Sequence, residues 1–179
     1  MLAASSPAAR LPPLLGAALR PLPLAPLQPV LALLLRAVVR QHPRIFDRLG
    51  GYSGRRFGLD PTDLPFALVL EPRPHDPRIR ALRRLPARGL DARISGPILG
   101  LIDLAEGRVD GDALFFARTL VVEGDMAAVV ALRNAIDGAG IDLAGDLAAS
   151  LGPLGPAAAQ ALRAGLTLIR RAAGGTAWS

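Results

Sequence analysis

The stretch ALFFARTLVVEGDMAAVVALRNAID, residues 113–137, decides the fold, because an apolar run ends at a glycine and a helical pattern begins at the next residue. Residues 114–122 are mostly aliphatic or aromatic, which predicts a β-strand with both faces largely covered. Asp125 is predicted to cap a helix that ends at Gly138. The apolar stripe of this helix consists of Met126, Val129, Leu132 and Ile136. A strand that passes directly into an amphipathic helix indicates an α+β fold.

This junction resembles the end of sterol carrier protein-2-like lipid-binding domains, in which a strand closing on V-E-G-D runs into a helix that lines a hydrophobic tunnel. The matching residues are VVEGD, residues 121–125. The segments DALFF (residues 112–116) and RNAID (residues 133–137) resemble more narrowly the UbiT-type accessory factors of oxygen-independent ubiquinone biosynthesis in bacteria. The resemblance extends over residues 20–165, loosely before residue 89 and closely over residues 91–137. It implies a lipid carrier with an apolar cavity.

Further strands and helices are predicted on both sides of this stretch. Short apolar runs and period-two alternation predict strands at residues 55–59, 66–70 and 90–95. Apolar spacings of three and four predict helices at residues 27–42, 45–49, 97–106, 143–151 and 158–169. Ser95 is the predicted cap of the helix at residues 97–106. Together these elements predict a mainly antiparallel sheet of four to five strands with helices covering one face.

The sheet and the helices at residues 97–106 and 125–137 are expected to form the two walls of an apolar cavity. Each CH₂ group buried between such walls contributes ~0.8 kcal/mol. Because the walls offer few directed hydrogen bonds, they favour a long apolar chain over a polar metabolite. The predicted lipid-binding residues are Leu68, Leu70, Ile94, Ile98, Leu101, Ile102, Leu114, Phe116, Leu120, Val122, Met126, Val129, Leu132 and Ile136. The same stripes are also typical of an ordinary filled core, and the sequence alone does not separate a hollow interior from a filled one.

Three polar residues lie inside the best-matched region. The simpler interpretation makes Arg118 a solvent-facing strand residue, Glu123 a strand terminus and Asp125 a helix cap. The functional hypothesis places Arg118 near the mouth of the cavity, where its guanidinium would hold the polar head of a phenol- or quinone-type ligand.

The sequence lacks the groupings expected of an enzyme or a metal site. With no cysteine there is no thiolate nucleophile, no disulfide and no Cys-based metal site, which suits a reducing cytoplasm. His42 and His75 are far apart and are predicted to lie at the surface. The glycine-rich residues 50–54 are predicted to form a loop. The predicted turn formers are Asp60, Asp63, Asp110 and Asp112. No metal or cofactor is expected, and the resemblance assigns the iron–sulfur chemistry to partner hydroxylases.

The net charge of +6 would attract anionic surfaces, and all 21 basic residues are arginine. The densest cluster contains Arg73, Arg78, Arg80, Arg83, Arg84 and Arg88. Prolines interrupt it and no aromatic residues are interleaved with it, which argues against nucleic-acid binding. The pattern favours a solvated hairpin loop, with a membrane-facing patch as the alternative.

A length of 179 residues with 51% apolar content predicts one domain with a sizeable core. Residues 1–26 are predicted to be a Pro-rich, extended or loosely ordered leader, and residues 173–179 a tail. Between them, residues 27–140 form the predicted lipid-binding domain and residues 141–172 the C-terminal helices that pack on or extend it. Prolines interrupt every apolar run near the start, so neither a signal peptide nor a membrane span is predicted. We expect a cytoplasmic protein whose membrane contact is peripheral, at the inner membrane face.

The favoured function is that of a non-catalytic accessory protein that binds polyprenylated ubiquinone precursors or phospholipid. The resemblance implies that it presents the precursors to oxygen-independent hydroxylases. One alternative is a structural or adaptor domain with a solid core that docks a protein or a membrane surface through its C-terminal helix. The stripe of that helix contains Leu162, Leu166 and Ile169 beside Arg163, Arg170 and Arg171. A third candidate function is that of an acyl-transfer enzyme, but the sequence offers no nucleophile–base pair to support it.

Overall fold

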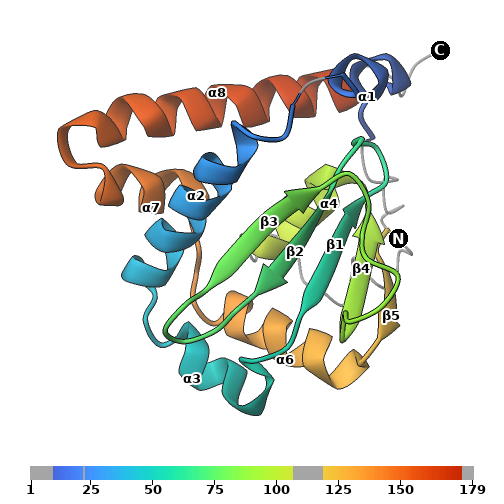
Figure 1. Ribbon diagram of the computed structural model, residues 1–179. Helices are drawn as coiled ribbons and strands as arrows, with labels where there is room; N and C mark the ends of the chain where they lie inside the picture. The colour runs from blue at the N-terminus through green and yellow to red at the C-terminus, as the bar shows by residue number, and fades with distance from the viewer. Residues whose placement is uncertain (1–9, 22, 107–118, 175–179) are drawn as a thin grey trace, which may run out of the picture.

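A mixed five-stranded sheet forms the centre of the protein (Figure 1). The computed structural model describes residues 10–21, 23–106 and 119–174. Within these residues the strands are β1 (Phe57–Pro61), β2 (Ala67–Glu71), β3 (Arg78–Leu82), β4 (Ala92–Gly96) and β5 (Val121–Gly124). Their order across the sheet is β3-β2-β1-β4-β5. The β1–β4 pair is parallel and the other neighbouring pairs are antiparallel, so the sheet is mixed, with the predicted number of strands.

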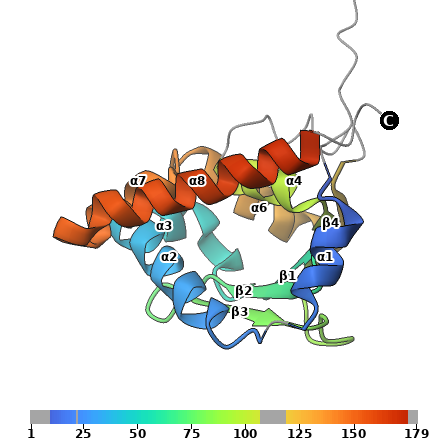
Figure 2. The same ribbon diagram turned by 90° about the horizontal axis from the view of Figure 1, so that it is seen from above.

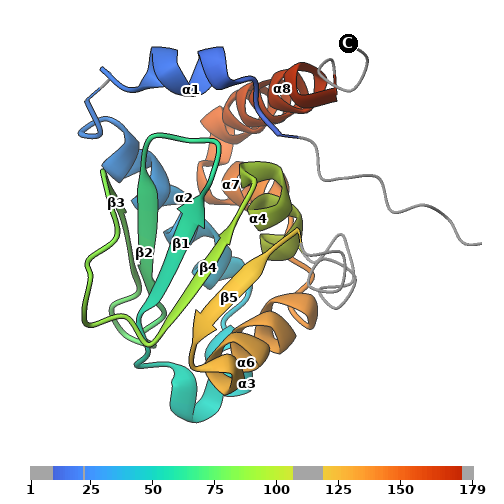
Figure 3. The ribbon, with the colours of Figure 1, turned by 90° about the vertical axis from the view of Figure 1, so that its right-hand side faces the viewer.

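Helices gather on one side of this sheet (Figure 3). The helices before the sheet are α1 (Pro13–Leu19), α2 (Leu27–Gln41), α3 (Ile45–Leu49) and the 3₁₀ turn η1 (Gly50–Tyr52). Those that follow are α4 (Ile98–Ala105), α6 (Met126–Asp137), α7 (Leu143–Ser150), η2 (Gly152–Leu154) and α8 (Gly155–Gly174). Figure 2 shows α8 lying along α7 and reaching α4, where Arg170 Nη2 lies 2.8 Å from Asp103 Oδ1. Among the described residues, no helix combines the length and the apolarity that a bilayer crossing requires.

The strand register places the apolar side chains of three neighbouring strands on the face that α4 and α6 cover. Phe57 is paired with Leu70 of β2 and Ala92 of β4, and Leu59 with Leu68 and Ile94. Since side chains alternate between the two faces of a strand, these residues all point the same way. They pack with buried residues of α4 and α6 into one core, which contains Leu49, Phe57, Ala92, Ile94, Leu101, Leu104, Leu120, Ala128, Val129, Leu132 and Ala135.

The opposite face of the sheet is partly covered by the segment between β3 and β4. A Cβ on Gly58 would lie 2.7 Å from Cδ1 of Leu90 and 2.8 Å from Cδ1 of Leu85, so the two leucines pack directly on the bare backbone of β1. On the same face the buried carboxylate of Glu71 binds arginine side chains at 2.9 to 3.2 Å. These partners are Arg56, Arg73 and Arg80. Charge-assisted pairing of this kind offsets the cost of burying the carboxylate.

The free edge of β3 is covered by α2. The side chain of Gln28 accepts a hydrogen bond of 3.1 Å from the backbone N–H of Ala81 and donates one of 2.7 Å to the carbonyl of Ala81. One amide side chain therefore satisfies both backbone groups of an edge residue that would otherwise be open to another strand. This pairing fixes α2 along the sheet edge (Figure 1).

Two segments predicted to lack regular structure contain elements. The Arg-rich segment predicted as a solvated hairpin loop includes β3, in which Ile79 and Ala81 alternate with exposed Arg78 and Arg80. The prolines on both sides hid this period-two pattern. The predicted loosely ordered leader contains α1, which begins at a proline whose missing N–H costs nothing at a helix start. Leu11, just before α1, is buried, and its N–H donates to Asp63 Oδ2.

Two local predictions about strand and helix ends are wrong. Ser95 does not cap the helix that follows, because it lies within β4. Instead, Asp63 Oδ1 accepts a 2.9 Å hydrogen bond from the N–H of Ile98, the first residue of α4. The strand expected to be covered on both faces is in fact an edge strand, and Val121 is exposed. Residues 114–118 of that predicted strand lie outside the described residues.

Candidate functional site

The junction between β5 and α6 is built around a close approach of two backbones. Gly124 has a φ angle of +92°, which favours glycine, and a Cβ there would lie 2.5 Å from the carbonyl oxygen of Asp91. The N–H of the next residue, Asp125, donates a 2.8 Å hydrogen bond to the same carbonyl. Glycine is therefore required both by the backbone conformation and by the space available.

Asp125 acts as the predicted helix cap. Its Oδ1 accepts a 3.0 Å hydrogen bond from the N–H of Ala128 in the first turn of α6. Glu123 is exposed, and its Oε2 lies 3.8 Å from Arg93 Nη1. For Asp125 and Glu123, the structure thus confirms the simpler interpretation of the sequence. Arg118, the candidate for a ligand head group, lies outside the described residues.

Asp91 anchors the other side of this junction. Its carboxylate accepts hydrogen bonds of 2.8 Å from the N–H of Arg56 and 2.7 Å from Arg55 Nη1. The hydrogen bond from the Arg56 backbone, followed by that from the Arg55 side chain, lowers the pKa of Asp91 below its ordinary value. The start of β1, the start of β4 and the start of α6 are therefore held together through one aspartate.

Most of the predicted lipid-binding residues lie in the packed core between the sheet and the helices α4 and α6. The buried ones are Leu68, Ile94, Leu101, Leu120, Val129 and Leu132. The partly buried ones are Leu70, Ile98, Ile102, Val122 and Ile136. Of these, Leu68, Ile98 and Ile102 lie outside the core cluster defined above. The remaining residues meet in one continuous apolar interface, which we call the sheet–helix interface.

The three remaining predicted lipid-binding residues are Met126, Leu114 and Phe116. Met126, the first residue of α6, is 56% exposed, so it does not contribute to the sheet–helix interface. Leu114 and Phe116 lie outside the described residues.

The sequence analysis also missed some residues of the interface, although a sequence pattern pointed to each of them. Phe57 lies in a predicted strand, and Ala128 and Ala135 follow the spacing of the α6 stripe.

The sheet–helix interface offers burial but almost no polar chemistry. Every residue of the core cluster and every residue packed against it is apolar except Tyr52. A buried acid lies near one end, where Glu106 follows α4 and its Oε2 is 4.0 Å from Arg170 Nη2. The side chains of the core cluster offer apolar contact, and none of them is a nucleophile, a base or a metal ligand.

His42 is not the surface residue that the sequence predicted. Its Nε2 lies 3.0 Å from Asp146 Oδ2, and only 19% of the histidine side chain and 11% of the aspartate side chain are exposed. Burial is the main reason that the pKa of Asp146 is raised above its ordinary value, an effect that the hydrogen bond to His42 opposes. This pair connects α2 to α7 across 104 positions of sequence, and no local pattern reports a contact of that range. His75 is exposed, as predicted.

The other polar candidates have structural roles. Asp60 forms an ion pair with Arg93 across the β1–β4 pair. Asp63 holds Leu11 and Ile98, as described above. Gly50 begins η1, so part of the predicted loop at residues 50–54 is a 3₁₀ turn. Asp110 and Asp112 lie outside the described residues. The part of the chain that the structure describes contains no group of three or more side chains suited to holding a metal ion.

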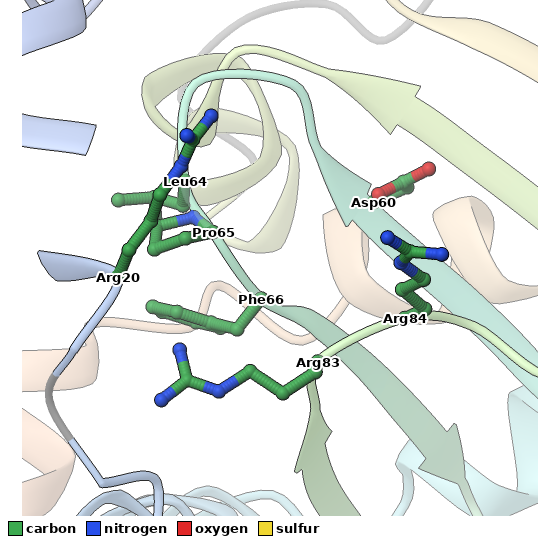
Figure 4. A pocket seen from close by; sticks show the side chains of 7 residues that line it. All are labelled: Arg20, Asp60, Leu64, Pro65, Phe66, Arg83 and Arg84. Atoms are coloured by element: carbon green, nitrogen blue, oxygen red, sulfur yellow. The ribbon is translucent and has the colours of Figure 1, made fainter. Parts of the chain in front are cut away.

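A hollow lies on the surface at the connection between β1 and β2 (Figure 4). It has a volume of about 520 Å³ and is lined by Arg20, Asp60, Leu64, Pro65, Phe66, Arg83 and Arg84. We call it the arginine pocket. None of the predicted lipid-binding residues lines it. The predicted arginine cluster is thus divided, since Arg73 and Arg80 bind Glu71 while Arg83 and Arg84 line this pocket.

The solved structures similar to this chain include three of low identity. The UbiJ-SCP2 ubiquinone synthesis protein is 20% identical, with a TM-score of 0.49, and the match covers 73% of this chain and 94% of that one. Sterol carrier protein 2 from Yarrowia lipolytica in its apo form is 14% identical, with a TM-score of 0.44 and coverage of 63% and 91%. The sterol carrier protein domain 2 of Helicoverpa armigera is 13% identical, with a TM-score of 0.44 and coverage of 61% and 87%.

No curated protein sequence matches the chain. The sequence profile of the SCP-2 sterol transfer family, in contrast, matches residues 35–137. This range is more than half of the chain, and it includes all five strands and the helices α4 and α6. It therefore contains both walls of the sheet–helix interface. The chain belongs to the SCP-2 sterol transfer family.

Proposed function

We propose that the protein is a non-catalytic lipid-binding accessory protein that holds a polyprenylated intermediate of ubiquinone biosynthesis at the sheet–helix interface. In this proposal it presents the intermediate to oxygen-independent hydroxylases. The observation that carries the proposal is the apolar interface between the sheet and helices α4 and α6, which lies within the family match. The resemblance of residues 112–116 and 133–137 to UbiT-type factors supplies the class of lipid and the pathway.

The chemistry of the interface suits an isoprenoid chain. A prenyl tail has only carbon and hydrogen, so its binding is driven by loss of apolar surface from water, at ~25 cal/mol for each Å² buried. The interface residues Ile94, Leu101 and Val129 offer aliphatic contact and demand no hydrogen bond from the ligand. A sugar or a nucleotide would leave its polar groups unpaired there, at a cost of a few kcal/mol for each group.

The polar head of such a ligand needs a different environment. A phenol or quinone ring carries oxygen atoms that accept hydrogen bonds, and a guanidinium is a strong donor to them. We assign this role to Arg118, which precedes Leu120 of the interface by two residues. In this proposal Arg118 binds the head group and the sheet–helix interface binds the tail. Replacing Arg118 should therefore change selectivity among head groups and leave retention of the tail intact.

The direct test is extraction of lipid from the purified protein followed by mass spectrometry. The protein should be produced in a bacterium that makes ubiquinone and purified without detergent. The proposal predicts prenylated ubiquinone precursors in stoichiometric proportion to protein. An extract that contains only phospholipid would support lipid binding but would contradict the assigned ligand. An extract no richer in lipid than that of an unrelated protein purified in parallel would contradict lipid binding itself.

A second candidate function is that of an adaptor with a solid core, and one observation favours it. The helix α8 exposes Leu168 beside a basic last turn that contains Arg171, an arrangement that suits docking to a partner or to a membrane surface. An adaptor would contain no extractable lipid, so the same extraction separates the two functions.

A further inference from the structure

We propose that the arginine pocket is a binding site for a phosphate group, carried either by the head group of an anionic phospholipid or by a soluble phosphate ester. The site is separate from the sheet–helix interface. Asp60, at one side of the pocket, alternates along β1 with the core-facing Leu59 and therefore points to the opposite face of the sheet. The proposal consequently does not depend on what the interface holds.

Three separate segments of the chain build the pocket. Arg20 follows α1, and Arg83 and Arg84 follow β3. Leu64, Pro65 and Phe66 belong to the connection between β1 and β2 and form its apolar part. Figure 4 shows the guanidinium of Arg20 beside Leu64 and that of Arg83 on the other side of the Phe66 ring. Arginines that are far apart in the sequence therefore surround one hollow.

The charges of this pocket call for an anion. Among the described residues that line it, the one carboxylate, Asp60, already forms an ion pair with Arg93 of the neighbouring strand. Within residues 10–21, 23–106 and 119–174, the side chains of Arg20 and Arg84 form no ion pair. A guanidinium presents a planar set of N–H donors that matches phosphate oxygens in pairs. A phosphate in the pocket would offer an acceptor to these guanidinium groups without competing with the Asp60–Arg93 pair.

The surroundings favour a phosphate attached to an apolar molecule. Leu14 of α1 is 82% exposed, and α1 leads directly to Arg20. The helix that leads to Arg20 therefore also exposes a large apolar side chain, a combination that suits the boundary between head groups and acyl chains. A single-stranded nucleic acid would instead favour several aromatic side chains for stacking of its bases, and Phe66 is the only aromatic residue among the described residues that line the pocket.

The test compares two double variants with the same loss of charge. Arg20→Gln with Arg84→Gln removes two pocket arginines, and Arg40→Gln with Arg88→Gln removes two exposed arginines outside the pocket. Each protein is sedimented with vesicles of phosphatidylcholine alone and with vesicles of equimolar phosphatidylcholine and phosphatidylglycerol. Glycerol 3-phosphate is titrated separately by calorimetry. Thermal unfolding checks that both variants remain folded, as expected for exposed side chains.

The expected result is that the protein binds a phosphate-containing probe and that the pocket variant loses about tenfold or more in affinity. The matched variant should lose much less. Binding to phosphatidylglycerol vesicles without binding to glycerol 3-phosphate would identify the lipid as the source of the phosphate, and binding to both would identify a soluble ester as sufficient. Equal losses in the two variants, or no binding to either probe, would overturn the proposal. Pocket-dependent binding of a single-stranded oligonucleotide without vesicle binding would also overturn it.

Discussion

The backbone carbonyl of Asp91 accepts a 2.8 Å hydrogen bond from the N–H of Asp125, and this contact ties the start of β4 to the start of α6. The contact is possible because Gly124 leaves room for the two backbones to approach. Both walls of the sheet–helix interface, β4 and α6, meet at this point. The geometry of the interface therefore depends on the junction that the sequence marks as V-E-G-D.

Replacing Gly124 with alanine should destabilise the protein by about 1–3 kcal/mol, the cost of a strained backbone at positive φ. The new Cβ would lie 2.5 Å from the Asp91 carbonyl oxygen, so the loss should fall in the upper part of that range. Gly140→Ala is the matched control, because Gly140 also has a positive φ but has open space around it. Urea unfolding measures both. Equal losses would show that the close approach to Asp91 contributes nothing.

Replacing Asp125 with alanine should cost about 0.5–2 kcal/mol, because the first turn of α6 loses its cap. Asp125→Asn should retain most of the stability, since an amide oxygen can accept the same hydrogen bond from Ala128. Circular dichroism during urea unfolding gives both values. If the asparagine variant were as unstable as the alanine variant, the negative charge and not the hydrogen bond would be the source of the stability.

Gln28→Ala should destabilise the protein by about 1–3 kcal/mol, because it leaves the N–H and the C=O of Ala81 without their partner. It should also expose the edge of β3 and increase aggregation, which light scattering would detect. Gln41→Ala, at the exposed end of the same helix, is the control and should have little effect. A Gln28 variant that matched the control in both measurements would rule out a role for this pairing.

The two aspartates with shifted pKa values should affect stability with opposite pH dependence. The pKa of Asp91 is lowered from 3.8, so its contribution is present above that pH and is lost as the pH falls through the folded-state value. The difference in unfolding free energy between the protein and Asp91→Asn should therefore increase as the pH rises through this range.

Asp146 should behave in the opposite way. Its pKa is raised above 3.8, so the folded protein holds this proton more tightly than the unfolded chain does. Its contribution is greatest below 3.8 and is lost as the pH rises through the folded-state value. The difference between the protein and Asp146→Asn should therefore decrease with rising pH. Unfolding by urea at a series of pH values measures both slopes, and slopes of the same sign would contradict the assigned causes.

The elements that local patterns define were predictable from the sequence. The apolar stripe of α6, its cap at Asp125 and the glycine before it follow from residue types at fixed spacings, and the structure contains all three. The helices α2, α4, α7 and α8 likewise lie close to their predicted positions. Such signals are local, since they depend on residues within a few positions of one another.

What the sequence could not supply depends on contacts between distant segments. Asp63 replaces Ser95 as the cap of α4 because the β1–β2 connection folds against that helix, which no local rule anticipates. His42 meets Asp146 for the same reason. The strand β3 was missed because the prolines on both sides hid its period-two pattern, and its edge is paired with Gln28, which is distant in the sequence. The arginine pocket is a further example, since Arg20 and Arg84 are brought together only by the fold.

The most direct test of lipid binding at the sheet–helix interface is to replace a side chain within it by a larger one. Val129 of α6 is 1% exposed and faces the sheet, whereas its neighbour Val130 is 44% exposed and serves as the matched control. The measurement is the amount of prenylated lipid extracted per mole of purified Val129→Phe, Val130→Phe and unchanged protein. We predict that Val129→Phe loses most of its lipid while remaining folded and that Val130→Phe retains it. Equal lipid content in all three proteins, or lipid in none of them, would contradict the account.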